Sequence, residues 1–113
     1  MKKIKNALVI LAGGKGSRFG KKLPKQFIEI NGENLIHFFL KRIDTRNFDK
    51  ILIVHKYSHL KYIKNIRIDF PSVNFLFANA GKNRQLSSFN ALRKLKPFKP
   101  KNILIHDAAR PNF

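Results

Sequence analysis

The chain has 113 residues, contains no cysteine, and carries 24 Lys and Arg against 6 Asp and Glu, for a formal net charge of +18. The length fits one small domain over residues 1–113, and 43% hydrophobic residues argue against a disordered basic tail. The lack of cysteine excludes a disulfide framework, a zinc finger of the cysteine type and thiol catalysis.

The first half of the chain predicts a strand followed by a helix. Residues 7–11 (ALVIL) form a continuous apolar run, typical of a strand buried on both faces of a parallel sheet. A loop rich in glycine and lysine follows over residues 12–24. Residues 27–30 predict a short extended piece that ends in the tight turn Asn31-Gly32. Residues 35–43 have apolar side chains at helical spacing.

The second half repeats this alternation. Residues 51–54, 73–78 and 103–105 are apolar and predict three further strands. Between them, residues 58–65 predict a helix of weak periodicity, and residues 86–95 predict a helix that ends before Pro97. Strands that alternate with helices indicate βαβ units, so the sequence predicts an α/β fold with a mostly parallel sheet.

Three segments lie where ligands bind in such sheets, beyond the carboxyl ends of the strands. The first follows Leu11 and combines glycines, cations and a serine, which suits a backbone cradle for phosphate. Its spacing matches neither the dinucleotide fingerprint nor the P-loop, and a Gly-rich turn without a ligand stays an alternative. The predicted cradle consists of Leu11, Ala12, Gly13, Gly14, Lys15, Gly16 and Ser17.

The other segments carry fewer, more specific side chains. Lys25 follows Pro24 and is able to reach back over the loop, although a solvated lysine is the common alternative. Residues 80–88 enter a helix whose N-terminus favours anions, and Asn83 or Gln85 is a candidate cap. Asp107 follows a strand directly and is a candidate Mg²⁺ ligand.

Histidine gives no comparable signal. We expect His106 to pack or hydrogen-bond rather than to catalyse. His37, His55 and His59 have no partners at ligand spacing, so we assign them no metal.

Together, three motifs in order resemble the sugar-phosphate cytidylyltransferases, above all the 2-C-methyl-D-erythritol 4-phosphate cytidylyltransferase family. The ribitol-5-phosphate cytidylyltransferases are similar and stay an alternative. The motifs are Ala12-Gly13-Gly14-x-Gly16-x-Arg18 with Pro24-Lys25-Gln26, then Gly81-x-x-Arg84-Gln85-x-Ser87, then His106-Asp107-Ala108-Ala109-Arg110-Pro111.

The resemblance implies a Rossmann-like nucleotidyltransferase fold and transfer of CMP from CTP to a sugar-alcohol phosphate, with release of pyrophosphate. Arg18 and Lys25 would be catalytic and stabilise the transition state. The backbone of residues 12–17 would hold the triphosphate, and Asp107 would organise Mg²⁺ or the ribose. The other implied nucleotide-binding residues are Gly81, Lys82, Arg84, Ser87 and Arg110.

The sequence also departs from the family pattern. Lys82 stands where the family often has an acidic or small residue, and Ser88 where it often has valine. Family members are considerably longer, so the resemblance implies the N-terminal, CTP-binding half, incomplete at its C-terminus, with an exposed last strand. We therefore expect weak CTP binding and slow or no turnover by the chain alone, and a homodimer only for the full-length family.

Two other interpretations of the sequence stay open in addition to an enzyme. One is an inactive fragment that keeps the fold without the chemistry. The other is a basic nucleic-acid-binding module, which the charge favours. The cations are spread along the whole chain without an interleaved stacking pattern of aromatic residues, which argues against nucleic acid as a partner. The apolar runs are too short to span a membrane and no cleavage site follows the first, so we expect a cytoplasmic protein.

Overall fold

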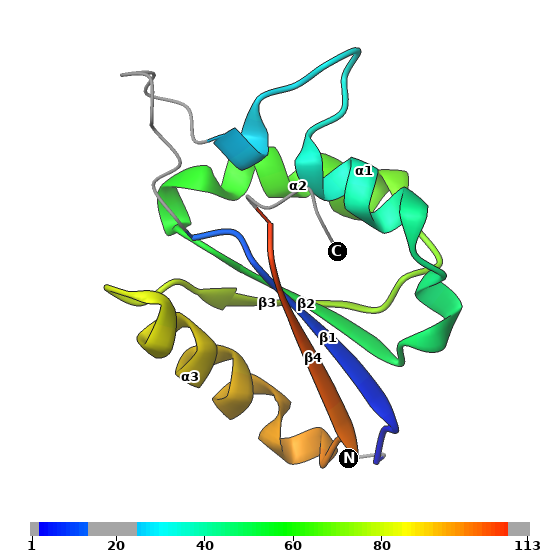
Figure 1. Cartoon of the computed structure of the whole chain (residues 1–113), viewed down its shortest axis with the longest axis vertical. Helices are drawn as coiled ribbons and strands as arrows, with labels where there is room; N and C mark the ends of the chain where they lie inside the picture. The colour runs from blue at the N-terminus through cyan, green and yellow to red at the C-terminus, as the bar shows by residue number, and fades with distance from the viewer. Residues whose placement is uncertain (1–2, 14–24, 109–113) are drawn as a thin grey trace.

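The computed structural model describes residues 3–13 and 25–108 (Figure 1). In this part of the chain a four-stranded sheet has the order β3-β2-β1-β4, and each neighbouring pair is parallel. The predicted parallel α/β sheet is therefore confirmed. Its strands are β1 (Asn6–Leu11), β2 (Lys50–His55), β3 (Phe75–Asn79) and β4 (Asn102–Asp107).

Helices cover both faces of this sheet (Figure 1). One face packs against α1 (Leu35–Arg42) and α2 (Leu60–Asp69), and the other packs against α3 (Arg84–Leu95). Four short 3-10 turns complete the described elements. They are η1 (Lys25–Phe27), η2 (Thr45–Asn47), η3 (Tyr57–His59) and η4 (Lys96–Phe98).

The continuous apolar runs of the central strands supply two cores at once. Successive side chains of a strand point to opposite faces. In β1, Leu8 and Ile10 therefore join the core under α1 and α2, whereas Val9 and Leu11 join the core under α3. This is why β1 and β2 read as unbroken hydrophobic runs rather than as alternating ones.

The segment before α1 differs in part from the prediction. The expected extended piece over residues 27–30 is wrong at its start, because Phe27 belongs to the 3-10 turn η1 and its side chain is fully buried. The expected turn is confirmed: Ile30 and Glu33 form an antiparallel bridge around Asn31 and Gly32, with φ of 54° and 81°. Positive φ at both central positions is the geometry that an Asn-Gly pair favours.

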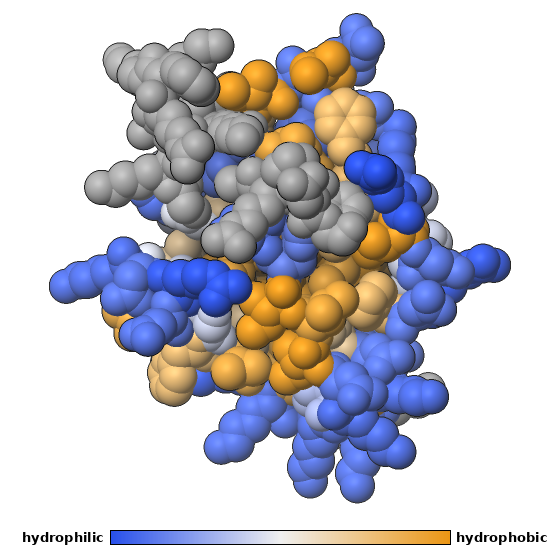
Figure 2. All heavy atoms as spheres, in the orientation of Figure 1, coloured by the Kyte–Doolittle hydropathy of each residue, from blue (hydrophilic) through white to orange (hydrophobic). Residues whose placement is uncertain are grey.

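The outer strand β4 has an apolar exposed surface. Figure 2 shows apolar side chains gathered near the middle of the view, where Figure 1 places β4, with hydrophilic side chains around them. Ile103, Leu104 and Ile105 are exposed by 37%, 56% and 36%. None of the described helices has the length and apolar character needed to cross a membrane.

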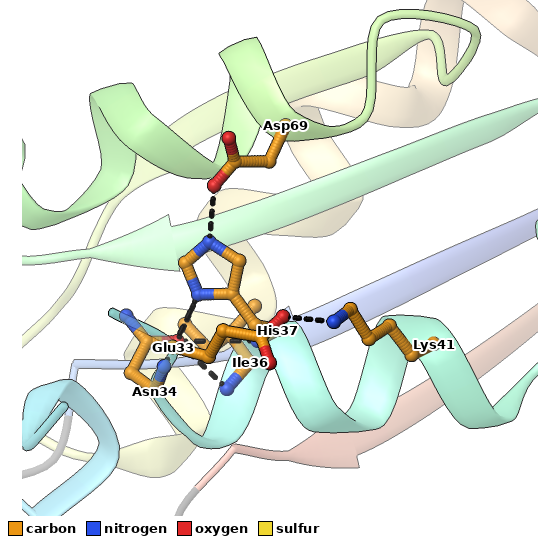
Figure 3. A network of polar contacts seen from close by, with 6 residues as sticks. All are labelled: Glu33, Asn34, Ile36, His37, Lys41 and Asp69. Atoms are coloured by element: carbon orange, nitrogen blue, oxygen red, sulfur yellow. Dashed lines mark hydrogen bonds and ion pairs between the residues drawn. The ribbon is translucent and has the colours of Figure 1, made fainter. Parts of the chain in front are cut away.

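A buried histidine connects the two helices on one face of the sheet (Figure 3). His37, in α1, accepts a hydrogen bond at Nδ1 from the backbone N–H of Asn34, at 3.2 Å. Its other ring nitrogen, Nε2, then carries the proton and donates to Asp69 at the end of α2, at 2.9 Å. Asn34 caps α1 in return, since its side chain accepts from the N–H groups of Ile36 and His37.

We expect His37→Ala to lower the free energy of unfolding by about 2–4 kcal/mol. The change leaves a cavity and removes the partner of the buried Asn34 N–H group. Lys41→Ala is the control, because it removes only the exposed ion pair with Glu33 drawn in the same figure, worth at most about 1 kcal/mol. Urea denaturation measures both variants, and equal midpoints for the two would contradict this role of His37.

Candidate functional site

A cavity of about 190 Å³ lies at the carboxyl end of the sheet. It brings together the three segments that the sequence singles out: the ends of β1 and β4 and the connection between β3 and α3. The residue that follows β2 also contributes. The cavity is lined by Leu11, Gly13, Lys56, Gly81, Lys82, Asn83, Arg84, Ser87 and Asp107.

Strand alternation decides which side chains reach this cavity. His106 stacks on Phe39 of α1, with ring centroids 4.1 Å apart, so its side chain lies on the α1 face. The next residue, Asp107, consequently faces α3. Asp107 pairs in register with Leu11, which packs in the core under α3. The expectation that His106 packs is confirmed. Because neighbouring side chains of a strand point to opposite faces, the carboxylate of Asp107 then reaches the cavity.

The start of α3 forms the opposite wall. Asn83 is the N-cap, and its side chain accepts a hydrogen bond from Leu86 N–H at 2.9 Å. Of the two predicted caps, Asn83 is therefore the one observed. Ser87 is buried, and its Oγ accepts from the N–H of Gly81 at 2.9 Å. The Ser87 hydroxyl proton has no acceptor among the described residues, so it is available to a ligand.

Glycine lets the two loops approach each other. A Cβ on Gly13 would lie 2.3 Å from the Cβ of Ala80, which is shorter than any real contact. A Cβ on Gly81 would lie 2.3 Å from the Cβ of Leu86. Both positions therefore need glycine for packing at the cavity wall, whatever ligand the cavity holds.

Gln26 connects the segment around Lys25 to the end of β1. Its side chain is buried, and its Nε2 donates to the carbonyl of Ala12 at 2.9 Å. The next residue, Phe27, stacks on Tyr62 with ring centroids 5.1 Å apart. These two contacts fix the backbone on one side of Lys25 against the end of β1 and against α2.

Several predicted site residues lie outside the described part of the chain. They are Gly14, Lys15, Gly16, Ser17, Arg18 and Arg110. The backbone of Lys25 lies in η1, and the position of its side chain is outside the described structure as well. Their roles stay predictions from the sequence.

The structure adds Lys56, which the sequence alone does not single out. It directly follows β2, and a single lysine outside any motif gives no signal in the sequence. Its charge acts on a neighbour: burial lowers the pKa of His59, and the positive charges of Lys56, His55 and Lys61 lower it further.

The lining of the cavity is positively charged overall. Three cationic side chains, Lys56, Lys82 and Arg84, face one carboxylate, Asp107. No group of three or more His, Cys, Asp or Glu side chains suited to a metal occurs among the residues the structure describes. A divalent cation here would therefore need ligand oxygens from a bound phosphate in addition to Asp107.

Comparison with known proteins identifies the family of the chain. Residues 6–113 match the family described as IspD, 2-C-methyl-D-erythritol 4-phosphate cytidylyltransferase. The bifunctional enzyme IspD/IspF of Pelagibacter ubique is 37% identical, over 96% of this chain and 28% of its own length. The 2-C-methyl-D-erythritol 4-phosphate cytidylyltransferase of Clostridium perfringens strain SM101 is 41% identical, over 90% of this chain and 45% of its own.

A solved structure is similar as well. The crystal structure of 4-diphosphocytidyl-2C-methyl-D-erythritol synthase from Anaerococcus prevotii superposes with a TM-score of 0.73 and 25% identity. It covers 96% of this chain and 44% of that chain, so the present chain spans less than half of each of these proteins. With a family match over residues 6–113 and relatives 37% and 41% identical over 96% and 90% of its length, the chain belongs to the 2-C-methyl-D-erythritol 4-phosphate cytidylyltransferase family.

Proposed function

We propose that this chain forms the CTP-binding part of a cytidylyltransferase that transfers CMP to 2-C-methyl-D-erythritol 4-phosphate and releases pyrophosphate. The reaction belongs to isoprenoid precursor biosynthesis, and we expect it to take place in the cytoplasm. One observation carries the proposal: described residues from each of the three motif segments, namely Gly13, Gly81 with Arg84 and Ser87, and Asp107, line one positively charged cavity at the carboxyl end of the parallel sheet.

The proposed chemistry needs positioning and charge stabilisation rather than a covalent intermediate. The acceptor phosphate attacks the α-phosphorus of CTP in line, and pyrophosphate leaves on the opposite side. Negative charge grows on the α-phosphoryl oxygens, where Arg18 and Lys25 would stabilise it. The buried bond from Gln26 to Ala12 supports this assignment, because it fixes the backbone next to Lys25 against the start of the glycine-rich segment.

The cavity suits the nucleoside part of CTP. Leu11 gives an apolar wall, the glycines allow close approach of a flat ring, and Ser87 offers a hydroxyl proton. Lys82 precedes α3 and Arg84 is its first residue, at the helix end where the dipole also favours negative charge. We assign Gly81, Lys82, Arg84 and Ser87 to nucleotide binding on these grounds.

Asp107 fits a role in holding Mg²⁺. Mg²⁺ is usually bound by one or two carboxylates together with substrate phosphates, and Asp107 supplies one carboxylate at the cavity. When bound, the ion would offset negative charge on the phosphates. The sugar-alcohol phosphate and the partner chain of a homodimer remain part of the proposal, since this chain spans less than half of its relatives.

A thermal-shift titration with Mg²⁺ and each of CTP, UTP, ATP and GTP tests the proposal. Ligand that binds only the folded chain raises the midpoint by mass action, by about 2.7 kcal/mol of stability at a hundred times the dissociation constant. We expect the largest rise with CTP. A folded chain whose midpoint responds to none of the four nucleotides would contradict the proposed site.

A further inference from the structure

Lys56 is a cation at the nucleotide cavity to which no family motif assigns a role. Its side chain is half-buried and lines the same cavity as Leu11 and Asp107. Its ammonium group has no hydrogen-bond or ion-pair partner among the described residues. A lysine ammonium carries three donors and no acceptor, so this position offers hydrogen-bond donors only.

The sheet places Lys56 and Asp107 on opposite sides of the cavity floor. His55, the last residue of β2, packs edge-on against Phe77, which belongs to the core under α1 and α2. The following residue, Lys56, therefore turns toward the α3 face, as Leu11 and Asp107 do. Strands β2 and β4 lie on either side of β1, so the two residues are separated by about two strand spacings, roughly 10 Å.

The lining favours a nucleobase near Lys56 over the phosphates. About 190 Å³ is less than the roughly 300 Å³ at which pockets for whole drug-sized ligands begin, so the cavity suits one part of a nucleotide. Asp107 lies about two strand spacings from Lys56 and would hold the phosphates through the proposed Mg²⁺, so the base rather than the phosphates falls near Lys56.

Hydrogen-bond donors on the cavity wall favour cytosine over uracil. Cytosine presents two adjacent acceptors, O2 and N3, whereas uracil carries a proton on N3 and presents a donor there. The Ser87 hydroxyl proton and the Lys56 ammonium both need acceptors. A site whose donors match the acceptors of cytosine binds uracil much more weakly, because the mismatched polar groups of the site are then left unpaired.

We propose that Lys56 is a specificity-determining residue that donates a hydrogen bond to N3 of the cytosine of CTP, the ring atom that is an acceptor in cytosine and a donor in uracil. The inference rests on the proposed cytidylyltransferase function and deepens it. It assigns the preference for cytosine over uracil in part to a side chain from the end of β2, in addition to the segment between β3 and α3.

The experiment compares Lys56→Met with Lys61→Met and the unchanged chain. Lys61 is exposed in the first turn of α2 and lines no part of this cavity, so its variant removes the same charge nearby without the contact. Calorimetry gives dissociation constants for CTP, UTP and inorganic triphosphate. Melting curves establish that each variant is folded.

We expect Lys56→Met to raise the dissociation constant for CTP at least about tenfold, because a hydrogen bond to a charged group usually contributes at least that much to binding. Binding of UTP and inorganic triphosphate should change no more than in Lys61→Met, so the preference for CTP over UTP falls. Equal losses for CTP, UTP and triphosphate would overturn the inference, as would unchanged CTP binding. If the unchanged chain binds no nucleotide, the proposed function itself fails.

Discussion

Replacing Gly13 by alanine is expected to weaken CTP binding at least about tenfold and to lower the free energy of unfolding by about 1–3 kcal/mol. The new methyl group would lie 2.3 Å from the Cβ of Ala80, so the end of β1 and the loop before α3 must move apart. Overpacking of this kind typically costs that much stability. The displaced loop carries Gly81, whose N–H donates to Ser87, so the cavity wall moves as well.

Gly32→Ala separates the effect on binding from the effect on stability. Gly32 has φ of +81° and open space within 4 Å of the position a Cβ would take, so alanine is strained there by its backbone alone. It lies in the turn before α1, outside the cavity lining. We expect this variant to lose stability yet to bind CTP as the unchanged chain does, in titrations followed by calorimetry. Normal CTP affinity in Gly13→Ala would disprove the close-approach argument.

Much of the fold follows from patterns that the sequence displays openly. The apolar run of β1 predicts a strand buried on both faces, because neighbouring residues must fill two different cores. The Asn31-Gly32 pair predicts its turn because both residues adopt positive φ. Helix ends are harder to place: α2 continues to Asp69, beyond the predicted end at residue 65.

The segment around Phe27 shows what local patterns miss. The sequence predicts an extended piece over residues 27–30, yet the structure has a 3-10 turn over Lys25–Phe27. The reason is tertiary: Phe27 stacks on Tyr62 of α2 and Gln26 bonds the Ala12 carbonyl, contacts between segments far apart in the sequence. No window of neighbouring residues contains that information.

The candidate site likewise contains residues that the sequence predicts and one residue that only the folded structure reveals. Gly13, Gly81 and Asp107 can be grouped from the sequence, because parallel strands bring their carboxyl ends to one edge of the sheet. Lys56 occupies the same edge but belongs to a chain with many lysines, and its sequence neighbours match no motif. Only the alternation of β2, seen in the folded sheet, distinguishes it from a solvated lysine.

Arg18→Ala and Lys25→Ala are each expected to lower the rate of CMP transfer by about 10²–10³-fold, the usual cost of losing one donor to a developing charge. CTP affinity should fall much less, since these cations would act mainly in the transition state. Because we expect slow turnover by the chain alone, the assay uses excess protein over labelled CTP, with 2-C-methyl-D-erythritol 4-phosphate as acceptor.

Lys101→Ala is the matched control for these two variants. Lys101 is exposed and directly precedes β4, at the amino edge of the sheet and therefore at the opposite end from the cavity. It removes one positive charge from the same strongly basic chain, so a general effect of charge on anionic substrates appears in all three variants. A transfer rate in Arg18→Ala or Lys25→Ala equal to that of Lys101→Ala would show that the cation concerned does not stabilise the transition state.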